Sequence, residues 1–538
     1  MHKAKNPRYI FVTGGVLSGL GKGIVSASIG KLLVEEYKVL PIKCDGYLNT
    51  DPGTMNPIEH GEVFVLDDGG EVDMDFGHYE RFLNINCKFD WNPTSGKIFS
   101  HIISKERKGE FLGKTVQLIP HVTDEIKNQW QTLAKKENAD FVLIELGGTI
   151  GDMEMDLFAE AARQLKLDLG EKNCLYVHLT YVPKLNVVGE QKTKPTQQSF
   201  NILQSKGLRP EIIVGRANDQ LTEKTKRKIA LFGNLSEDKI ISNPDLKTVY
   251  ELPLVFEKEG LVKLIENKFN IKTKINDKWK ELVNNIKNPK QEINIAICGK
   301  YTELKDSYAS IMEALIHSGA HLNCKVNLVW LETTDIENDK VKLSDSFKNI
   351  DGVIVPGGFG SRGVEGKIKT IKYIRENNIP FLGICYGLQL AVTEFARNVC
   401  NLNGAHSTEV NENSIHPVVD ILPEQKEIEN KGGTMRLGAY EAKITKGSII
   451  ESLYKSETAS ERHRHRYEVN PEYHQILEDK GLLLSGKSFD GKLVEFIELP
   501  DHKYFVATQG HPELKSRLER PAPLFLGLVK AAIGKRGN

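Results

Sequence analysis

One cysteine lies in a sequence that favours nucleophilic chemistry. Cys385 stands between Gly383 and Gly387, after the apolar segment Pro380–Ile384 and before a predicted helix over 388–397. Glycines on both sides let the chain turn sharply, so that the side chain stands exposed above a sheet. The helix N-terminus would stabilise the thiolate, which is the reactive form. Although a cysteine outside a disulfide is usually a buried structural residue, this glycine frame predicts a nucleophile.

A cysteine nucleophile needs a base, and the base needs an orienting group. His511 and Glu513 follow the predicted strand Tyr504–Thr508, and the spacing lets both side chains leave on one side. Pro356–Gly360 follows another predicted strand, and its glycines would let backbone N–H groups approach a developing oxyanion. Each segment alone also fits an ordinary turn. Together they predict a Cys–His–Glu triad.

These segments resemble the class I glutamine amidotransferases, from about Ile293 to the C-terminus. The resemblance implies that Cys385 attacks the glutamine carboxamide, His511 shuttles the proton and Glu513 orients His511. The basic run Arg462–Arg466 would by itself suit a nucleic-acid patch or a solvated strand. The implied glutamine contacts are Gly358, Tyr386, Gly387, Leu388, Gln389, Glu409 and Arg466.

The N-terminal half contains a glycine-rich segment, Gly14–Gly23, between a predicted strand and a predicted helix. The N–H groups of such a loop cradle phosphates, and Lys22 adds a positive charge. The segment is not a standard P-loop, since Gly23 stands where Ser or Thr would hold magnesium. The metal must therefore be held elsewhere, and the acidic cluster Asp73–His78 and the strand-terminal Glu145 are candidates.

Six sequence segments add to the evidence from the glycine-rich segment and the acidic residues of the N-terminal half. This half contains, in this order, GGVLSGLGKG, CDGYLNTDPGTMNPIEHGEVFV, DFGHYERF, IELGGTIGD, HLTYVPK and KTKPTQ. The last string, Lys192–Gln197, suits a phosphate chain by its own chemistry, although an exposed loop would look similar. With the glutaminase segments behind them, these strings make the whole chain resemble the CTP synthase family. The resemblance implies ATP-dependent amination of UTP at C4 through a 4-phosphorylated intermediate, the last step of de novo CTP synthesis, with ammonia from glutamine.

The same resemblance implies ligands and regulation. Asp75 and Glu145 would bind Mg²⁺, Lys22 the phosphates of ATP, and Lys43 would lie near the triphosphate. GTP would activate glutamine hydrolysis, CTP would inhibit, and the enzyme would be a homotetramer. The implied ATP contacts are Gly19, Leu20, Gly21, Lys22, Gly23, Ile24, Asp75, Pro244, Asp245 and Leu246. The implied UTP or CTP contacts are Ser18, Asp152, Met153, Glu154, Lys192, Thr193, Lys194, Pro195, Thr196, Gln197 and Lys228.

Three places depart from the family's pattern. Gly510 precedes His511 where an aromatic residue is usual, Tyr386 follows the nucleophile where Leu is common, and Pro244–Leu246 replaces a Lys-Asp-Val-like adenine loop. The missing aromatic residue could loosen the His511 loop and lower glutaminase coupling. We expect the other two to affect contacts made largely by backbone.

Composition limits the remaining possibilities. The 538 residues are 40% hydrophobic and 27% charged, which is typical of a soluble globular protein of at least two domains. The 72 Lys and Arg balance the 72 Asp and Glu, so no charge footprint indicates nucleic acid or an anionic membrane. Neither a signal peptide nor a membrane-spanning run is present. Seven scattered cysteines favour a reducing cytoplasm.

Alternating apolar runs and helical stretches predict an α/β fold with two doubly wound, mainly parallel sheets. We expect a synthetase domain over 1–269, a charged linker over 270–291 with a helix around Trp279, and a glutaminase domain over 292–538. Residues 424–433 should form a polar surface loop. The predicted strands are Tyr9–Thr13, Val39–Lys43, Phe141–Glu145, Leu175–Thr180, Ile212–Val214, Lys239–Ser242, Ile293–Cys298, Val326–Leu331, Gly352–Val355, Pro380–Ile384 and Tyr504–Thr508.

Two other functions fit parts of this pattern. An amidotransferase for another acceptor, such as a corrinoid carboxylate, could share the layout, but KTKPTQ and DFGHYERF argue against it. A P-loop partitioning or filament-forming protein would normally keep Ser or Thr after Lys22, where this chain has Gly23, and would leave the triad unexplained. Filament formation could coexist with catalysis.

Overall fold

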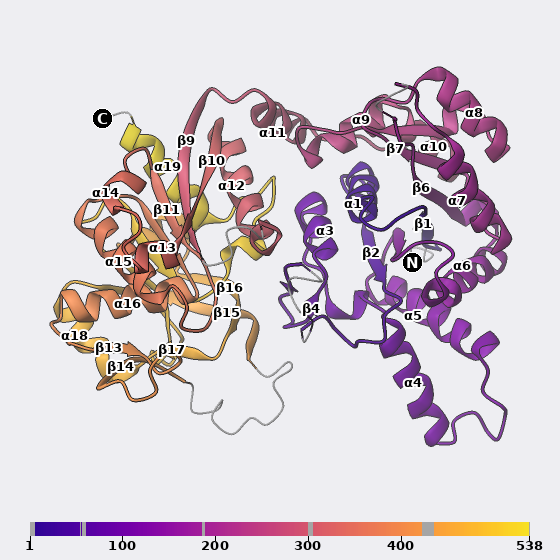
Figure 1. The fold of residues 1–538 in the computed structure, drawn as a ribbon. Coiled ribbons are helices and arrows are strands. Elements are labelled where there is room, and N and C mark those ends of the chain that lie inside the picture. The colour runs from indigo at the N-terminus through magenta and orange to yellow at the C-terminus, as the bar shows by residue number, and fades with distance from the viewer. Residues whose placement is uncertain are drawn as a thin grey trace. The chain divides into compact units, whose positions relative to one another are not determined.

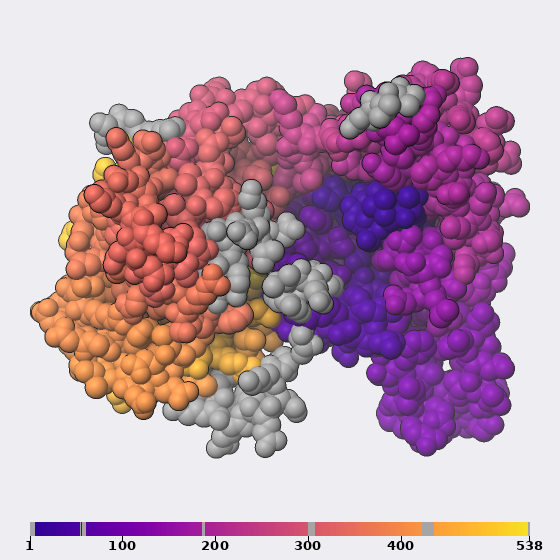
Figure 2. Space-filling model, viewed as in Figure 1, coloured from indigo at the N-terminus to yellow at the C-terminus, as the bar shows by residue number. Residues whose placement is uncertain are grey.

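The computed structural model describes residues 6–53, 55, 61–185, 189–299, 305–421 and 435–536, and the others are grey in Figures 1 and 2. The predicted loop over 424–433 lies outside the described residues. By its internal contacts the chain divides into two compact units. Unit 1 comprises Met1–Pro52 and Asp75–Val283, and unit 2 comprises Gly53–Met74 and Asn284–Asn538. Figure 2 shows the surface of the chain from the side viewed in Figure 1, coloured by residue number.

Unit 1 is built on a six-stranded sheet of order β2-β5-β1-β6-β7-β8, in which all pairs are parallel. Strands β2 and β5 are buried along their whole length, as in a parallel sheet covered on both faces. Each strand predicted for this half is confirmed to within two residues. The strands are β1 (Arg8–Gly14), β2 (Val39–Cys44), β5 (Phe141–Leu146), β6 (Cys174–Tyr181), β7 (Ile212–Arg216) and β8 (Ile240–Asn243).

Helices surround this sheet (Figure 1). They include α11, which occupies half of the predicted linker. Trp279 on α11 is fully buried, and its Nε1 donates to the carbonyl of Tyr250 at 3.0 Å. The first half of the predicted linker therefore packs in unit 1. The helices are α1 (Lys22–Leu33), α3 (Asp75–Leu83), α4 (Ser95–Arg107), α5 (Thr123–Lys136), α6 (Asp156–Leu169), α7 (Lys194–Ser205), α8 (Glu223–Gly233), α9 (Leu252–Lys258), α10 (Leu261–Phe269) and α11 (Asp277–Lys287).

Unit 2 is built on a nine-stranded sheet of order β10-β9-β11-β12-β20-β19-β18-β15-β16. The first five strands are parallel, as predicted, and the last four continue the sheet antiparallel. The strands are β9 (Gln291–Gly299), β10 (Cys324–Glu332), β11 (Gly352–Val355), β12 (Phe381–Ile384), β15 (Arg436–Ile444), β16 (Thr458–His465), β18 (Leu483–Lys487), β19 (Val494–Glu498) and β20 (Phe505–Thr508). A small separate sheet contains β13 (Ala405–Ser407), β14 (His416–Ile421) and β17 (Tyr467–Val469).

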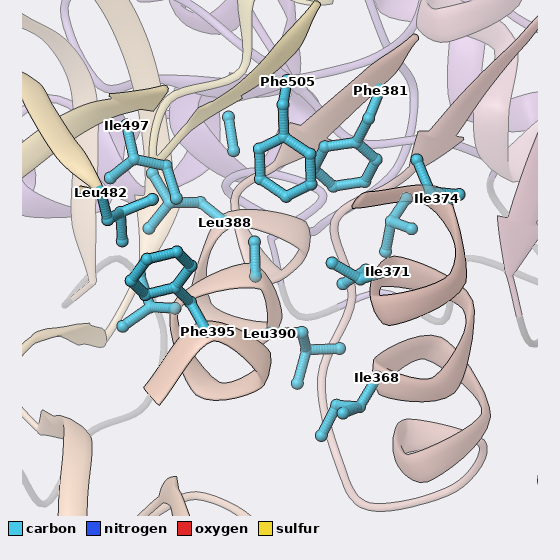
Figure 3. Close-up of a cluster of buried hydrophobic side chains, with 14 of the residues drawn as sticks. Ile368, Ile371, Ile374, Phe381, Leu388, Leu390, Phe395, Leu482, Ile497 and Phe505 are labelled. Carbon is cyan, nitrogen blue, oxygen red and sulfur yellow. The ribbon is translucent and has the colours of Figure 1, made fainter. Parts of the chain in front are cut away.

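Alternate residues of the parallel strands face two hydrophobic clusters. Ile295 and Ile297 of β9 face the cluster formed with α12 (Ala309–His321) and α19 (Pro523–Arg536). Ala296 and Cys298 face the cluster formed with α15 (Val364–Glu376) and α16 (Tyr386–Asn398) (Figure 3). The central strands are therefore apolar throughout, which made them visible in the sequence. The shorter helices are α13 (Thr333–Glu337), α14 (Leu343–Ser346), α17 (Ile449–Tyr454) and α18 (His474–Asp479).

A hairpin from the N-terminal part of the chain belongs to unit 2. It consists of β3 (Phe64–Val65) and β4 (Glu71–Val72), which pair antiparallel. The sequence prediction placed it within 1–269, because strands of two residues carry no readable periodicity. In the described parts of the chain, no helix has the length and apolar character needed to span a membrane.

Candidate active site

Cys385 lies between β12 and α16 in a strained backbone conformation, with φ of 52° and ψ of −101°. Its two neighbouring glycines are required by close packing. A Cβ atom on Gly387 would lie 2.1 Å from the carbonyl oxygen of Val355, and one on Gly383 would lie 2.8 Å from Cβ of Ala507. The sharp turn predicted from the sequence is present, and its strain is typical of functional sites. The Cys385 side chain was predicted to stand exposed, but it is only 5% exposed, because the segments that carry Gly357 and Gln509 pack against it.

His511 and Glu513 lie beside this turn, after β20. Nδ1 of His511 is 2.7 Å from Oε1 of Glu513, whose side chain is buried in the short helix η10 (Pro512–Lys515). Burial alone would lower the pKa of His511, but the charges of Glu513 and Cys385 outweigh it and raise this pKa well above its usual value. An imidazolium at His511 favours a thiolate at Cys385. The structure therefore brings the three predicted residues together.

The glycine loop after β11 lies against the triad. A Cβ atom on Gly357 would be 2.9 Å from Cε1 of His511, so only glycine fits there. The hydroxyl of Tyr386 donates to the carbonyl of Gly360 at 2.8 Å, and the N–H of Gly360 donates to Glu409 at 2.8 Å. The Tyr386 side chain thus helps to hold the glycine loop.

The glycine-rich loop before α1 has the conformation expected of a phosphate cradle. Gly19 and Gly21 have φ of 75° and 87°, and Gly21 caps α1 without a side-chain partner for the first N–H groups. Nζ of Lys22 donates to the carbonyl of Gly148 at 2.6 Å. A Cβ atom on Gly23 would lie 1.9 Å from Oδ1 of Asp75. The glycine that breaks the P-loop pattern is thus required by the neighbouring carboxylate.

Carboxylates and lysines gather beside this loop. Lys43 contacts Asp75 at 2.7 Å and Asp45 at 3.0 Å. Glu145 is buried and accepts a hydrogen bond of 2.5 Å from the hydroxyl of Tyr79. Burial and the charge of Asp75 raise the pKa of Glu145 to about 7, although Lys43 opposes this. A buried carboxylate beside a second, partly exposed carboxylate suits a hard divalent cation.

The number of side chains that could bind such a cation is small. The described residues contain no group of three or more His, Cys, Asp or Glu side chains arranged to hold a metal. Mg²⁺ in proteins commonly takes only one or two carboxylates and completes its shell with phosphate and water oxygens.

Comparison with known proteins decides the family. Residues 8–271 match the model of the CTP synthase N-terminus, and residues 303–531 match that of class I glutamine amidotransferases. The CTP synthase of Methanococcus maripaludis is 55% identical over 98% of this chain and 100% of its own length. That of Methanocaldococcus jannaschii is 53% identical over 98% and 99%.

The chain belongs to the CTP synthase family. It is therefore a glutamine-hydrolysing ligase of pyrimidine biosynthesis, with a synthetase domain ahead of a class I glutamine amidotransferase domain. A solved Trypanosoma brucei CTPS glutaminase domain with bound acivicin is 36% identical, with a TM-score of 0.42 over 45% of this chain and 94% of that one. The resemblance drawn from the sequence is confirmed.

Part of the predicted UTP site of the CTP synthase fold lines a depression of about 320 Å³ in unit 1. Thr193 lies at its edge just before α7, and Lys228 on α8 also lines it. Its other walls carry Lys184, which ends the HLTYVPK string, and Lys224; neither was predicted as a nucleotide contact. The remaining lining residues are Gly189, Glu190, Gln191, Asp219, Gln220, Thr222 and Thr225.

Other predicted nucleotide contacts lie outside this depression. Asp152 caps the short helix η3 (Met153–Met155), in which Met153 is exposed and Glu154 packs against Gly46. Asp245 lies in the Pro244–Leu246 segment, which departs from the family's sequence pattern. It accepts hydrogen bonds from Arg216 at 2.5 Å and from Asn218 at 3.0 Å. A larger depression of 480 Å³, lined in part by Tyr37 and Trp91, contains none of the predicted residues.

Leu388 and Gln389, two of the predicted glutamine contacts, lie in the first turn of α16. The side chain of Leu388 lies in the hydrophobic cluster around α16 (Figure 3), and the N–H of this residue donates to the carbonyl of Cys385 at 3.0 Å. Gln389 donates to the carbonyl of Tyr467 at 2.9 Å. Gln509, which was not predicted, approaches Sγ of Cys385 to 3.6 Å through Nε2. The only feature of the sequence that could have indicated Gln509 is its position two residues before His511.

Gly510 is tightly packed in this glutaminase domain. A Cβ atom there would lie 2.8 Å from Cβ of Glu461 and 3.3 Å from the carbonyl of Arg462. Its N–H donates to the hydroxyl of Thr508 at 3.1 Å. Glycine at this position therefore permits close approach of β16 to the segment that carries His511.

Proposed function

We propose that this chain aminates UTP at C4 to give CTP, using ATP to activate the ring and ammonia released from glutamine at Cys385. The observation that carries the proposal is the triad: a strained cysteine at a helix N-terminus beside a histidine whose Nδ1 is 2.7 Å from a buried carboxylate. The glycine-rich loop with Lys22 and Asp75 supports the nucleotide half.

Glutamine hydrolysis follows from the triad. The thiolate of Cys385 attacks the carboxamide carbon, and the imidazolium of His511 gives its proton to the leaving nitrogen. Ammonia departs and a thioester remains. Water then attacks the thioester, His511 accepts its proton, and glutamate and the thiolate are released. Glu513 keeps the imidazole oriented, and N–H groups of the loop Gly357–Gly360 stabilise the oxyanion.

Amination needs ATP because a carbonyl oxygen is a poor leaving group. O4 of UTP takes the γ-phosphoryl group, ADP leaves, and ammonia then displaces phosphate from C4. Lys22 and the N–H groups of Gly19–Ile24 bind the phosphates of ATP. Asp75 and Glu145 would hold Mg²⁺, whose charge offsets the negative charge of the transferring group.

The nucleotide sites and regulators follow from the family resemblance. UTP lies at Lys192–Gln197 and Lys228, supported by the lysines around the 320 Å³ depression. CTP competes for this place through Ser18 and Asp152–Glu154 and inhibits, and GTP activates glutamine hydrolysis. The enzyme works as a homotetramer in the cytoplasm, with no nucleic-acid or membrane partner.

The test compares nitrogen sources. CTP formation from UTP, ATP and Mg²⁺ is measured with glutamine and with ammonium chloride, in the wild type and in Cys385→Ala. The variant should lose only glutamine-driven synthesis. No CTP from either source in the wild type would overturn the UTP assignment, and UTP would then fail to raise the melting temperature.

A further inference from the structure

The hairpin of β3 and β4 presents one carboxylate from a rigid turn. The N–H of Leu66 donates to the carbonyl of Gly70 at 2.9 Å, and that of Gly69 to the carbonyl of Leu66 at 3.1 Å. These bonds enclose Asp67, whose carbonyl accepts from the N–H of Ala439 on β15 at 2.9 Å. The backbones pack so closely that a Cβ atom on Gly438 would lie 2.8 Å from that carbonyl oxygen. The position of Asp67 on unit 2 is therefore tightly fixed.

Asp67 pairs with a buried arginine of β16. Arg462 is 0% exposed, and its Nε donates to Oδ1 of Asp67 at 2.6 Å. Its guanidinium lies 5.3 Å from the ring centre of Phe64 in the same hairpin. A buried guanidinium without a carboxylate would be costly. Burial opposes ionisation of Asp67, but Arg462 and Lys515 outweigh it and lower the pKa of this carboxyl.

Arg462 also contacts both ends of the segment that carries the triad histidine. Its carbonyl accepts from the N–H of His511 at 2.7 Å, and its Nη1 donates to the carbonyl of Leu514 at 3.2 Å. Glu513 lies between these two contacts. One residue of β16 therefore fixes the backbone on both sides of the His511–Glu513 pair. Lys515 adds a tether to Ser460 at 2.6 Å, which does not involve the hairpin.

We propose that Asp67 is a positioning residue for His511, acting through Arg462 to hold the His511–Leu514 turn against Cys385. The inference rests on the proposed glutaminase function. Without the charge of Asp67, the Arg462 guanidinium would turn toward water and release Leu514, and the imidazole would lose its alignment. A displacement of about 1 Å at a reacting group can cost ~100-fold in rate.

The test uses the full-length protein with Asp67→Asn, which keeps the shape and removes the charge. For glutamine hydrolysis, kcat should fall by about 10- to 100-fold, while KM for glutamine and ammonium-driven CTP synthesis stay within about twofold of the wild type. Asp67→Glu, which keeps the charge, should restore most of the rate.

The matched control is Glu71→Gln in the same hairpin. Glu71 pairs with Arg464 at 2.8 Å, and no described contact joins this pair to His511. It should leave kcat near the wild-type value. Equal losses in both variants would assign the effect to docking of the hairpin and overturn the inference.

Three further results are decisive. An unchanged kcat in Asp67→Asn, or loss of ammonium-driven synthesis as well, would also overturn the inference. Glutamine-driven synthesis retained by Cys385→Ala would instead overturn the proposed triad, so the two failures are distinguishable.

Discussion

The hydroxyl of Tyr386 offers a sharp test of how the oxyanion loop is held. Tyr386→Phe removes one hydrogen bond, of 2.8 Å to the carbonyl of Gly360, and keeps the ring in its buried place. Burial raises the pKa of this hydroxyl, as does the charge of Glu409, so it remains a donor. A neutral hydrogen bond of this kind contributes about 0.5–1.5 kcal/mol. The bond between Gly360 and Glu409 remains, so the loop should shift without unfolding.

If that free energy holds the loop in its catalytic position, kcat/KM for glutamine should fall by roughly 2- to 12-fold. Ammonium-driven CTP synthesis should not change. The assay is glutamate release at several glutamine concentrations, with thermal unfolding measured on the same samples.

Tyr504→Phe is the matched control for this variant. Tyr504 is also buried, and its hydroxyl donates to the carbonyl of Leu524 at 2.7 Å, at the other end of β20 from His511. Its loss should lower the melting temperature by a similar amount and leave glutamine hydrolysis intact. Equal kcat/KM values in Tyr386→Phe and the wild type, with lowered stability, would show that the Tyr386 bond serves the fold alone.

Three other variants test the site. Gly23→Ser restores the usual P-loop residue but places a Cβ atom 1.9 Å from Oδ1 of Asp75. CTP synthesis from both nitrogen sources should therefore fall, and the free energy of unfolding should drop by about 1–3 kcal/mol. Improved CTP synthesis would contradict this. Gly510→Ala should lower both the melting temperature and glutamine hydrolysis, because its Cβ would press on Glu461; faster hydrolysis would instead support a loop loosened by glycine. Glu513→Gln should slow glutamine hydrolysis by about 100-fold or more while sparing ammonium-driven synthesis. Glu513 raises the pKa of His511, so the stabilisation that Glu513 gives is fully present below about pH 6.5 and is lost as pH rises through the pKa of His511 in the folded protein. The free energy of unfolding of Glu513→Gln, measured with urea, should therefore differ most from that of the wild type at acidic pH.

The sequence predicted the strands that carry runs of apolar residues. All eleven predicted strands are present, and most are buried along their length, whereas the edge strand β10 is only partly buried. The antiparallel strands were missed because their pattern is mixed: β16 reads TASERHRH, yet Arg462 is buried in an ion pair with Asp67 and His463 is buried beside Glu495. Pairing of distant charges leaves no local signal, and the two-residue strands of the hairpin leave none either.

The triad could be predicted because glycines and a Pro mark the turns that carry it. Gln509 and the hydroxyl contact of Tyr386 could not, since each depends on a partner more than 20 residues away. The sequence likewise could not show why residue 23 is a glycine. The cause is Asp75, a residue of α3 that only the fold brings next to the loop.

The hairpin has a consequence for the order in which the molecule can fold during synthesis. Asp67 and Arg462 are 395 residues apart, so at ~5–20 residues per second the ribosome makes the partner of Asp67 roughly 20 to 80 s after the hairpin. During that interval Phe64, Val65, Leu66 and Val72, all fully buried in the finished protein, have nowhere to pack. The N-terminal sheet can close meanwhile, since Met1–Pro52 and Asp75–Val283 form one compact unit. Chaperone binding and sensitivity to truncation should therefore concentrate on residues 61–74, early in translation.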